Sequence, residues 1–250
     1  MDTLKLRIEH KRPEPVDDLP MGLVWIEQGP HRAALLTPDE IEEGREYPLV
    51  TVLHGAGRQD ELLMKGCKGE AERRQALFLI PRSLHMTWDL IAMGMSGGAS
   101  LDPAVTETTS ARPDLDFFEY AYDLIYRRFP VDRDRQALLG YSDGASYGLS
   151  VGLSNPQIFS AVMAWAAGFL ALDGGAIPEG APKPPIYLEY GSHDELFPLE
   201  QVAKPMQANL EELGYEVSFH VDQGGRHWPS STFQDEALDW FFSEAWETRS

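Results

Sequence analysis

A serine flanked by glycines lies near the middle of the 250-residue chain, in the sequence Gly140-Tyr141-Ser142-Asp143-Gly144. The apolar run 137–139 comes directly before it, and a pattern with helical spacing follows. A strand that turns sharply into a helix can hold a serine in a strained conformation with its Oγ exposed, and the glycines let the two elements pack closely. The pentapeptide alone is a weak signal, because glycine and serine are common. It makes Ser142 the candidate nucleophile if the chain also supplies a base, an acid and oxyanion donors.

A serine hydroxyl needs an adjacent base near neutral pH, and seven histidines compete for that role. His227 follows a predicted strand at 216–221 and precedes the last predicted helix. It therefore lies at the carboxyl end of a strand, where open α/β sheets bind ligands. We predict that His227 is the base and that His54 stabilises a turn. The other histidines lie in early segments, in a long loop, beside the candidate acid or within a strand: His10, His31, His85, His193 and His220.

The acid that orients the histidine is expected on a loop between the serine and the histidine, in the chain order Ser, Asp, His. Asp194 is our choice, because it follows the apolar run 186–190 after only a few residues. Glu195 is the alternative, since one residue of slippage in the loop would exchange them. Asp173 lies in a looser loop and Asp222 is close to His227 in sequence, so both rank lower.

Two backbone amides are needed to stabilise the oxyanion of a tetrahedral intermediate, each worth on the order of 3 kcal/mol of barrier. One is expected from Asp143, the residue after the nucleophile. The other is expected from the turn after the apolar strand 49–54, which runs into His54-Gly55. Ala56 is the first choice for this amide and Gly57 the second.

Large side chains near these turns are candidates for the substrate pocket. Trp88 and two methionines, Met93 and Met95, lie in a long loop, and Trp165 ends a predicted strand. Trp228 is next to the predicted base, and Gly57 adjoins the oxyanion turn. For each large side chain, packing in the core or under a lid is at least as well supported as substrate contact.

The elements that must position these residues alternate between short apolar runs and segments with helical periodicity. That alternation predicts a mostly parallel, doubly wound central sheet flanked by helices, with an antiparallel pair at its N-terminal edge. We predict strands at 22–27, 32–36, 49–54, 76–80, 137–141, 160–165, 186–190 and 216–221. Helices are predicted at 61–75, at 115–129 behind a cap at Asp114, at 143–154, at 199–213 with a kink or a true start at Pro205, and at 232–246.

Residues 1–250 are predicted to form a single domain, because one α/β domain of this length is common. Residues 1–20 form an N-terminal extension or edge segment. The stretches 85–113 and 166–185 are too long and irregular for plain connections, and 85–113 is a candidate lid.

Charge and cysteine content limit the partners and the cellular compartment that we expect for this protein. The formal charge of −19, from 21 Lys and Arg against 40 Asp and Glu, excludes nucleic acid and anionic lipid as favoured partners. Cys67 is the single cysteine, which excludes an internal disulfide framework and fits a reducing compartment. The first residues do not resemble a signal peptide, and no run is apolar enough to span a membrane. We expect a cytoplasmic protein, and the oligomeric state is left open.

With these motifs in place, the chain resembles α/β-hydrolase esterases, in particular the phospholipase/carboxylesterase family and the feruloyl-esterase and polyhydroxybutyrate-depolymerase-like proteins. The resemblance covers nearly everything after Arg32 and implies the α/β-hydrolase fold, the triad Ser142, Asp194 and His227, and oxyanion amides from Ala56 and Asp143. Many relatives have a second glycine after the sharp turn that holds the serine, where this chain has Ala145. The motifs that carry it are Tyr47-Pro48-Leu49 running into Leu53-His54-Gly55, Val131-Asp132 before Gly140-Tyr141-Ser142, and Gly191-x-x-Asp194.

The predicted activity is hydrolysis of carboxylic esters of small or medium substrates through an acyl-enzyme, with no metal or organic cofactor. The same triad would also serve a thioesterase or a peptidase. A third hypothesis is a catalytically silent hydrolase fold that binds a ligand, which the intact triad residues disfavour.

Overall fold

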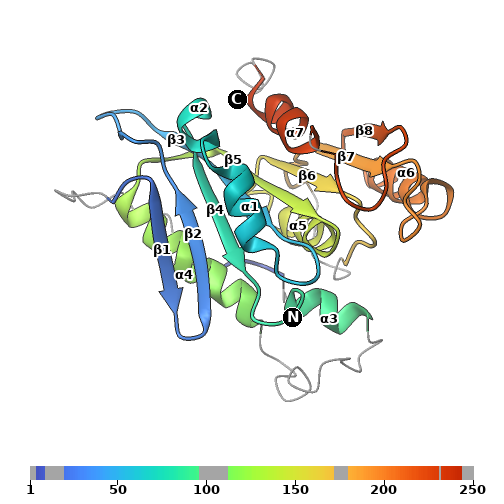
Figure 1. The fold of residues 1–250 in the computed structure, drawn as a ribbon, viewed down its shortest axis with the longest axis horizontal. Helices are drawn as coiled ribbons and strands as arrows, with labels where there is room; N and C mark the ends of the chain where they lie inside the picture. The colour runs from blue at the N-terminus through green and yellow to red at the C-terminus, as the bar shows by residue number, and fades with distance from the viewer. Residues whose placement is uncertain (1–3, 9–19, 96–111, 172–179, 231, 244–250) are drawn as a thin grey trace.

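The computed structural model of the protein describes residues 4–8, 20–95, 112–171, 180–230 and 232–243. These residues contain an eight-stranded sheet with the order β1-β2-β4-β3-β5-β6-β7-β8 (Figure 1). The β1–β2 and β2–β4 pairs are antiparallel, and every other pair is parallel. The predicted fold class is therefore confirmed. The strands are β1 (Leu23–Gln28), β2 (His31–Leu36), β3 (Tyr47–Leu53), β4 (Leu77–Arg82), β5 (Val131–Tyr141), β6 (Ala161–Trp165), β7 (Ile186–Gly191) and β8 (Val217–Asp222).

Each strand coincides with a predicted one, apart from the start of β5. That strand begins at Val131, which pairs with Tyr47, and the register shifts before Leu49 pairs with Gln136. The first residues of β5 after Val131 are charged and only partly buried, so no apolar run marks them. From 137 onward, β5 is buried between β3 and β6, which is why this part was predicted.

Helices cover both faces of the sheet, and in Figure 1 α1 lies in front of the sheet while α4 lies behind it. On the front face, α7 contacts α1 through Gln234, whose Nε2 donates to the Gly66 carbonyl at 3.1 Å. On the other face, Phe118 of α4 packs edge-on against Tyr147 of α5, with ring centroids 5.9 Å apart. The helices are α1 (Asp60–Cys67), α2 (Glu70–Arg74), α3 (Asp89–Met95), α4 (Pro113–Arg128), α5 (Asp143–Ser154), the π-helix η1 (Leu199–Ala203), α6 (Lys204–Glu212) and α7 (Phe233–Phe242).

Two predicted helices are interrupted in the structure. The predicted helix 61–75 is divided into α1 and α2 at Gly69, whose φ of +94° lies in the left-handed region. The predicted helix 199–213 begins as the π-helix η1 and continues as α6, with Pro205 in the first turn of α6. Proline has no backbone N–H to donate, so it is tolerated in the first turn of a helix more readily than in its interior.

The predicted cap at Asp114 is wrong, because this residue lies within α4 and its carboxylate binds other amides. Asp114 accepts from the backbone N–H of Leu84 at 2.9 Å and of Asp89 at 2.8 Å. Asp89 in turn accepts from the Asp114 amide at 3.1 Å. Burial, and then the neighbouring Asp89 charge, raise the pKa of Asp114 to about 8. This carboxyl pair ties the start of α3 to the start of α4. The candidate lid 85–113 thus includes α3, and its residues 96–111 lie outside the described part of the chain.

Residues 4–8 of the predicted N-terminal extension pack against the end of α5. Leu4 and Leu6 are buried. The Asn155 side chain accepts from the Leu6 amide at 2.8 Å and donates to the Leu4 carbonyl at 2.8 Å. None of the helices in the described ranges is both long and apolar enough to cross a lipid bilayer.

Candidate active site

Ser142 lies in the one-residue turn between β5 and α5, with φ of +53° and ψ of −115°. The first backbone hydrogen bonds of α5, to the Ser142 carbonyl, place the helix directly against the end of β5. A Cβ on Gly140 would overlap the Gly144 carbonyl, and a Cβ on Gly144 would overlap the Leu53 carbonyl of β3. Both flanking glycines are therefore required by close backbone contacts. Ala145, the departure from the related sequences, is buried and fits at the start of α5.

The three predicted triad side chains form a continuous hydrogen-bonded chain. The Nε2 atom of His227 lies 2.9 Å from the Oγ of Ser142, and its Nδ1 lies 2.9 Å from an Oδ of Asp194. The second oxygen of Asp194 accepts from the amides of Leu196 at 2.8 Å and Phe197 at 2.9 Å. With Asp194 buried and bonded at both oxygens, Nδ1 carries the imidazole proton and Nε2 is left to accept the serine proton.

The loops that carry Asp194 and His227 are joined by backbone contacts. The His193 amide donates to the Gly225 carbonyl at 2.8 Å, and the Ser192 amide donates to the Asp222 carbonyl at 2.9 Å. A Cβ on Gly191 would overlap the backbone of the histidine loop. These contacts hold the loops of Asp194 and His227 in register, and a structural role for His193 stays a prediction.

The other candidate acids do not reach the histidine in the described residues. Asp194 is buried and bonded to His227, whereas Glu195, one residue later, is exposed. The Asp222 carboxylate lies against Gly225 in its own loop. Asp173 lies outside the described residues.

Trp165 contacts the loop of His227 from inside the protein. Its side chain is fully buried at the end of β6, and its indole N–H donates to the His227 carbonyl at 2.8 Å. The ring packs edge-on against Phe233 of α7 at 5.2 Å. The prediction that Trp165 contacts substrate is therefore wrong, because its polar edge and its faces are taken up by the protein. Trp165 instead positions the loop that carries His227.

In the turn after β3, the amide of Gly57 is hydrogen-bonded within the protein, whereas that of Ala56 has no acceptor among the described residues. The Gly57 amide donates to the Met86 carbonyl at 2.8 Å, so it is not available to an oxyanion and the second choice is ruled out. The Ala56 amide donates to no acceptor in the part of the chain that the structure describes. Asp143 opens α5, and the first amides of a helix have no intrahelical acceptor. The amides of Ala56 and Asp143 are therefore available to an acceptor, and their role toward an oxyanion stays a prediction.

His54 holds this turn as a neutral side chain. Its Nδ1 donates to the Gly55 carbonyl at 2.7 Å, and its Nε2 accepts from the Ser83 amide at 3.1 Å. The ring is buried and stacks on Trp88 at 4.6 Å. Burial lowers the pKa of His54, which favours the uncharged imidazole that this pair of hydrogen bonds requires. This geometry agrees with the predicted turn-stabilising role.

Comparisons with known proteins bear on the fold. No family model matches the chain, and no curated protein matches it. Among solved structures, a ferulic acid esterase from the anaerobic fungus Anaeromyces mucronatus, solved with ferulic acid, aligns with a TM-score of 0.64 at 15% identity over 96% of this chain and 98% of that one. An S-formylglutathione hydrolase from Agrobacterium tumefaciens aligns with a TM-score of 0.63 at 18% identity over 90% of this chain and 96% of that one. The esterase PE8 aligns with a TM-score of 0.60 at 22% identity over 88% and 98%. This chain has the α/β-hydrolase fold.

Of the remaining substrate-pocket candidates, Trp88 is wrong and Trp228 stays a prediction. Trp88 is fully buried between His54 and Tyr147, whose ring lies 5.0 Å away, and its indole donates to the His54 carbonyl at 2.8 Å. Trp228 is 67% exposed beside His227. Nothing is described of the side chains of Met93 and Met95.

Sequence reasoning missed two contacts that brace the turn around Ser142 and the start of α5. The Thr87 hydroxyl donates to the Asp143 carboxylate at 2.5 Å, which ties the segment before α3 to the residue after the nucleophile. The Ser146 hydroxyl accepts from the Gly168 amide at 2.9 Å, which ties α5 to the loop after β6. Neither Thr87 nor Ser146 belongs to a motif, and the contacts arise between segments far apart in sequence.

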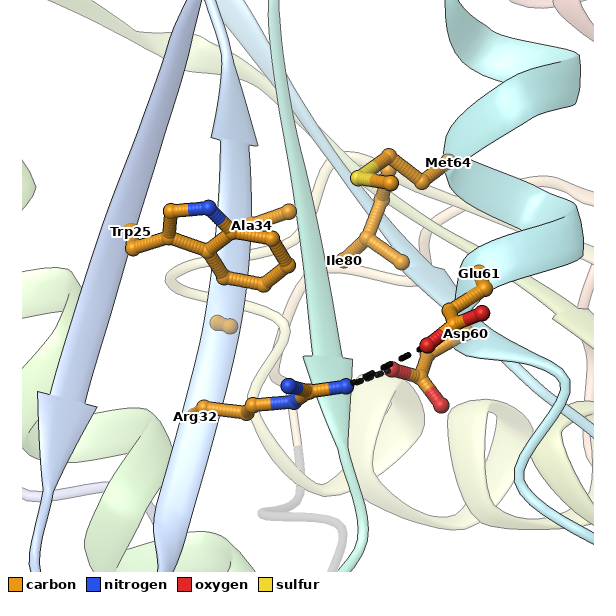
Figure 2. Close-up of a pocket in the computed structure, with 8 residues that line it drawn as sticks. Trp25, Arg32, Ala34, Asp60, Glu61, Met64 and Ile80 are labelled. Atoms are coloured by element: carbon orange, nitrogen blue, oxygen red, sulfur yellow. Dashed lines mark ion pairs between the residues drawn. The ribbon is translucent and has the colours of Figure 1, made fainter.

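A hollow at the antiparallel edge of the sheet is not a ligand site (Figure 2). It lies between Trp25 of β1, Arg32 of β2 and Met64 of α1. Arg32 reaches Asp60 at 3.6 Å and Glu61 at 3.7 Å, and its guanidinium lies 5.3 Å from the centre of the Trp25 ring. These side chains leave no free volume for a water molecule. Within the described ranges, no group of three or more His, Cys, Asp or Glu side chains is arranged to hold a metal ion.

Proposed function

We propose that this protein is a serine hydrolase that cleaves carboxylic esters of small or medium size through an acyl-enzyme. The observation that carries the proposal is the hydrogen-bonded chain from Asp194 through His227 to Ser142, with both links at 2.9 Å, on a strained turn. A base in contact with the hydroxyl and oriented by a buried acid is the arrangement that activates a serine.

The reaction follows from the positions of these groups. His227 takes the proton of Ser142 at Nε2 while Oγ attacks the ester carbonyl carbon. The negative charge formed on the carbonyl oxygen is accepted by the amides of Ala56 and Asp143. The bond from the carbonyl carbon to the alcohol oxygen then breaks, and Nε2 returns the proton to that oxygen. In the second half, Nε2 takes a proton from water, the resulting hydroxide attacks the acyl carbon, and the proton returns to Ser142 as the acid leaves.

Two further observations favour esters as substrates. The structural neighbours include the esterase PE8, a ferulic acid esterase and an S-formylglutathione hydrolase, and two of these three names support an ester substrate. The formal charge of −19 opposes the approach of polyanionic substrates and favours neutral or cationic ones. A thioesterase or peptidase uses the same triad with a different leaving group and is the second candidate.

A fluorophosphonate probe and short-chain nitrophenyl esters test the proposal. Wild-type protein should be labelled and should turn over the esters, and Ser142→Ala should lose both, with kcat lower by about 10⁶. The chain offers a matched control in Ser218, whose hydroxyl lies 2.8 Å from His220 on β8 but which occupies no elbow. Ser218→Ala should keep full labelling and turnover.

The possible outcomes separate the hypotheses. Labelling that survives in Ser142→Ala would reject Ser142 as the nucleophile. Labelling without ester turnover, combined with hydrolysis of acyl thioesters or peptides, would assign the second candidate. Absence of both labelling and turnover in the wild type would favour a hydrolase fold that only binds ligands.

A further inference from the structure

A cavity of about 280 Å³ lies between the loop that follows β6 and the helices η1 and α6. Phe169, Leu170, Val202 and Met206 supply its apolar lining. Figure 1 shows that β6 and β7 point toward the same edge of the sheet, so the loop and η1 both leave the sheet at its catalytic edge. The loop after β6 and the segment that leads into η1 thus follow strand ends at the edge that also carries Ser142 and Asp194.

One aromatic ring links this cavity to His227. Phe197 packs edge-on against the His227 ring, with centroids 5.2 Å apart. A Cβ on Gly168 would overlap the Phe197 ring, so the same ring also lies against Gly168. Gly168 itself lines the cavity. The loop that carries it is fixed by the Tyr190 hydroxyl, which donates to the Ala167 carbonyl at 2.7 Å.

The order of the strands decides which half of an ester would reach the cavity. β5 ends at the nucleophile, and β3, with the oxyanion turn after it, lies on one side of β5. β6, β7 and β8 lie on the other side, and β7 and β8 lead to Asp194 and His227. The leaving alcohol oxygen must receive its proton from His227, so the alcohol has to lie on the His227 side of the carbonyl carbon. The segments that line the cavity follow β6 and β7, on that side of β5.

The lining indicates the chemistry of the group that fits. The residues around the cavity include two side-chain amides, Gln201 and Asn209, and none of these described residues is charged. A volume near the lower end of the range for ligand pockets holds on the order of ten non-hydrogen atoms. Such a site favours a neutral, mainly apolar group with a hydrogen-bonding function, and it disfavours an ionised one, which would have no counter-charge.

We propose that this cavity binds the alcohol moiety of the ester and selects small, neutral, partly apolar alcohols. The inference rests on the proposed function and adds a specificity site to it. Val202, Leu170 and Met206 then determine which leaving groups are accepted, and the acyl group is bound elsewhere.

The test uses two series of esters, which vary one half of the substrate at a time. In the first, the acyl group is acetyl and the alcohol is methanol, benzyl alcohol or 2-phenylethanol. In the second, the alcohol is methanol and the acyl chain is lengthened from acetyl to hexanoyl. Val202→Trp fills the cavity from η1 and Leu170→Trp fills it from the loop. Glu200→Gln, at an exposed position of η1, is the matched control.

We expect each tryptophan variant to lower kcat/KM for benzyl and phenylethyl acetate at least tenfold relative to methyl acetate. The acyl series should keep the wild-type ratios in both variants, and the control should keep them in both series. A loss that follows acyl length, or equal rates for all alcohols relative to the wild type, would overturn the proposal.

Failure of the pocket and failure of the proposed function give different results. Wild-type protein that neither reacts with fluorophosphonate nor hydrolyses any ester refutes the proposed function and the pocket with it. Wild-type hydrolysis with tryptophan variants that do not discriminate between alcohols refutes the pocket alone. If one tryptophan variant does not fold, as judged by circular dichroism, the other decides the outcome, since the two act from different elements.

Discussion

Replacing Ser142 by glycine and by alanine would measure the backbone strain stored at the nucleophile. Both variants lack Oγ, so both lose the 2.9 Å hydrogen bond to His227 and all triad activity. They differ only by a Cβ, at a position whose φ is +53°. A non-glycine residue in this region is strained because its Cβ crowds the backbone, and glycine removes that crowding.

The expected difference follows from two opposing terms. Strain of this kind costs about 1–3 kcal/mol, which glycine would recover in the folded state. Glycine also gives the unfolded chain more freedom, which costs about 0.4–1 kcal/mol of stability relative to alanine. The net gain is about 1 kcal/mol in the free energy of unfolding. In a chain of this size, that raises the Tm of Ser142→Gly about 3 °C above that of Ser142→Ala.

The assay is thermal unfolding followed by circular dichroism, with urea unfolding as a second measure. The same pair of substitutions at Ser150, inside α5, serves as the control, because both variants there lose the same hydroxyl contacts. In a regular helix the order should reverse, with glycine about 1 kcal/mol less stable than alanine. A Ser142→Gly protein that melts at or below Ser142→Ala would refute the argument that the fold holds this residue under strain.

Three further predictions concern the groups around the nucleophile. Asp194→Asn should lower kcat by about 10⁴, because the amide no longer orients and stabilises the protonated His227, whereas Glu195→Gln should leave kcat nearly unchanged. Trp165→Phe should lower kcat about fivefold with KM unchanged, because the 2.8 Å hydrogen bond to the His227 carbonyl is worth about 1 kcal/mol. The pKa of Asp114, raised to about 8 by burial and then by its carboxyl neighbour, means that the folded state holds a proton that the unfolded chain has lost above about pH 4. The free energy of unfolding should therefore fall as the pH rises from 5 toward about 8 in the wild type, by at most about 1.4 kcal/mol per pH unit, and less steeply in Asp114→Asn.

Each of these has a result that would contradict it. A loss of kcat in Glu195→Gln comparable to that in Asp194→Asn would mean that both carboxylates act on the base. An unchanged kcat in Trp165→Phe would show that His227 is positioned without the indole. For Asp114, urea unfolding at several pH values is the measurement, and parallel pH profiles for wild type and variant would mean that the buried pair does not take up a proton on folding.

Much of the fold could be predicted from local pattern. The inner strands β3, β6 and β7 are apolar runs, because a parallel strand inside the sheet is buried on both faces and tolerates few polar residues. The start of β5 was not predicted, because its charged residues belong to the partly exposed end of the strand. The break between α1 and α2 was not predicted either. The helical periodicity of the sequence continues across Gly69, but the backbone leaves the helical conformation there.

Chain order and position at strand ends also predicted the three residues that the structure brings into hydrogen-bond contact, Ser142, Asp194 and His227. Ser142 could be found because the turn itself requires the glycines around it. A Cβ on Gly140, for example, would overlap the backbone of Gly144. His227 could be found because it follows the last strand.

The roles of neighbouring side chains were decided only by the tertiary structure. Spacing did not distinguish Asp194 from Glu195, because the direction in which each points depends on the loop backbone and on the histidine loop beside it. Nor did it show that Trp165 faces inward to the His227 carbonyl, 62 residues away. A sequence pattern records which residues follow one another along an element, whereas the partner of a side chain comes from whichever distant element packs against it.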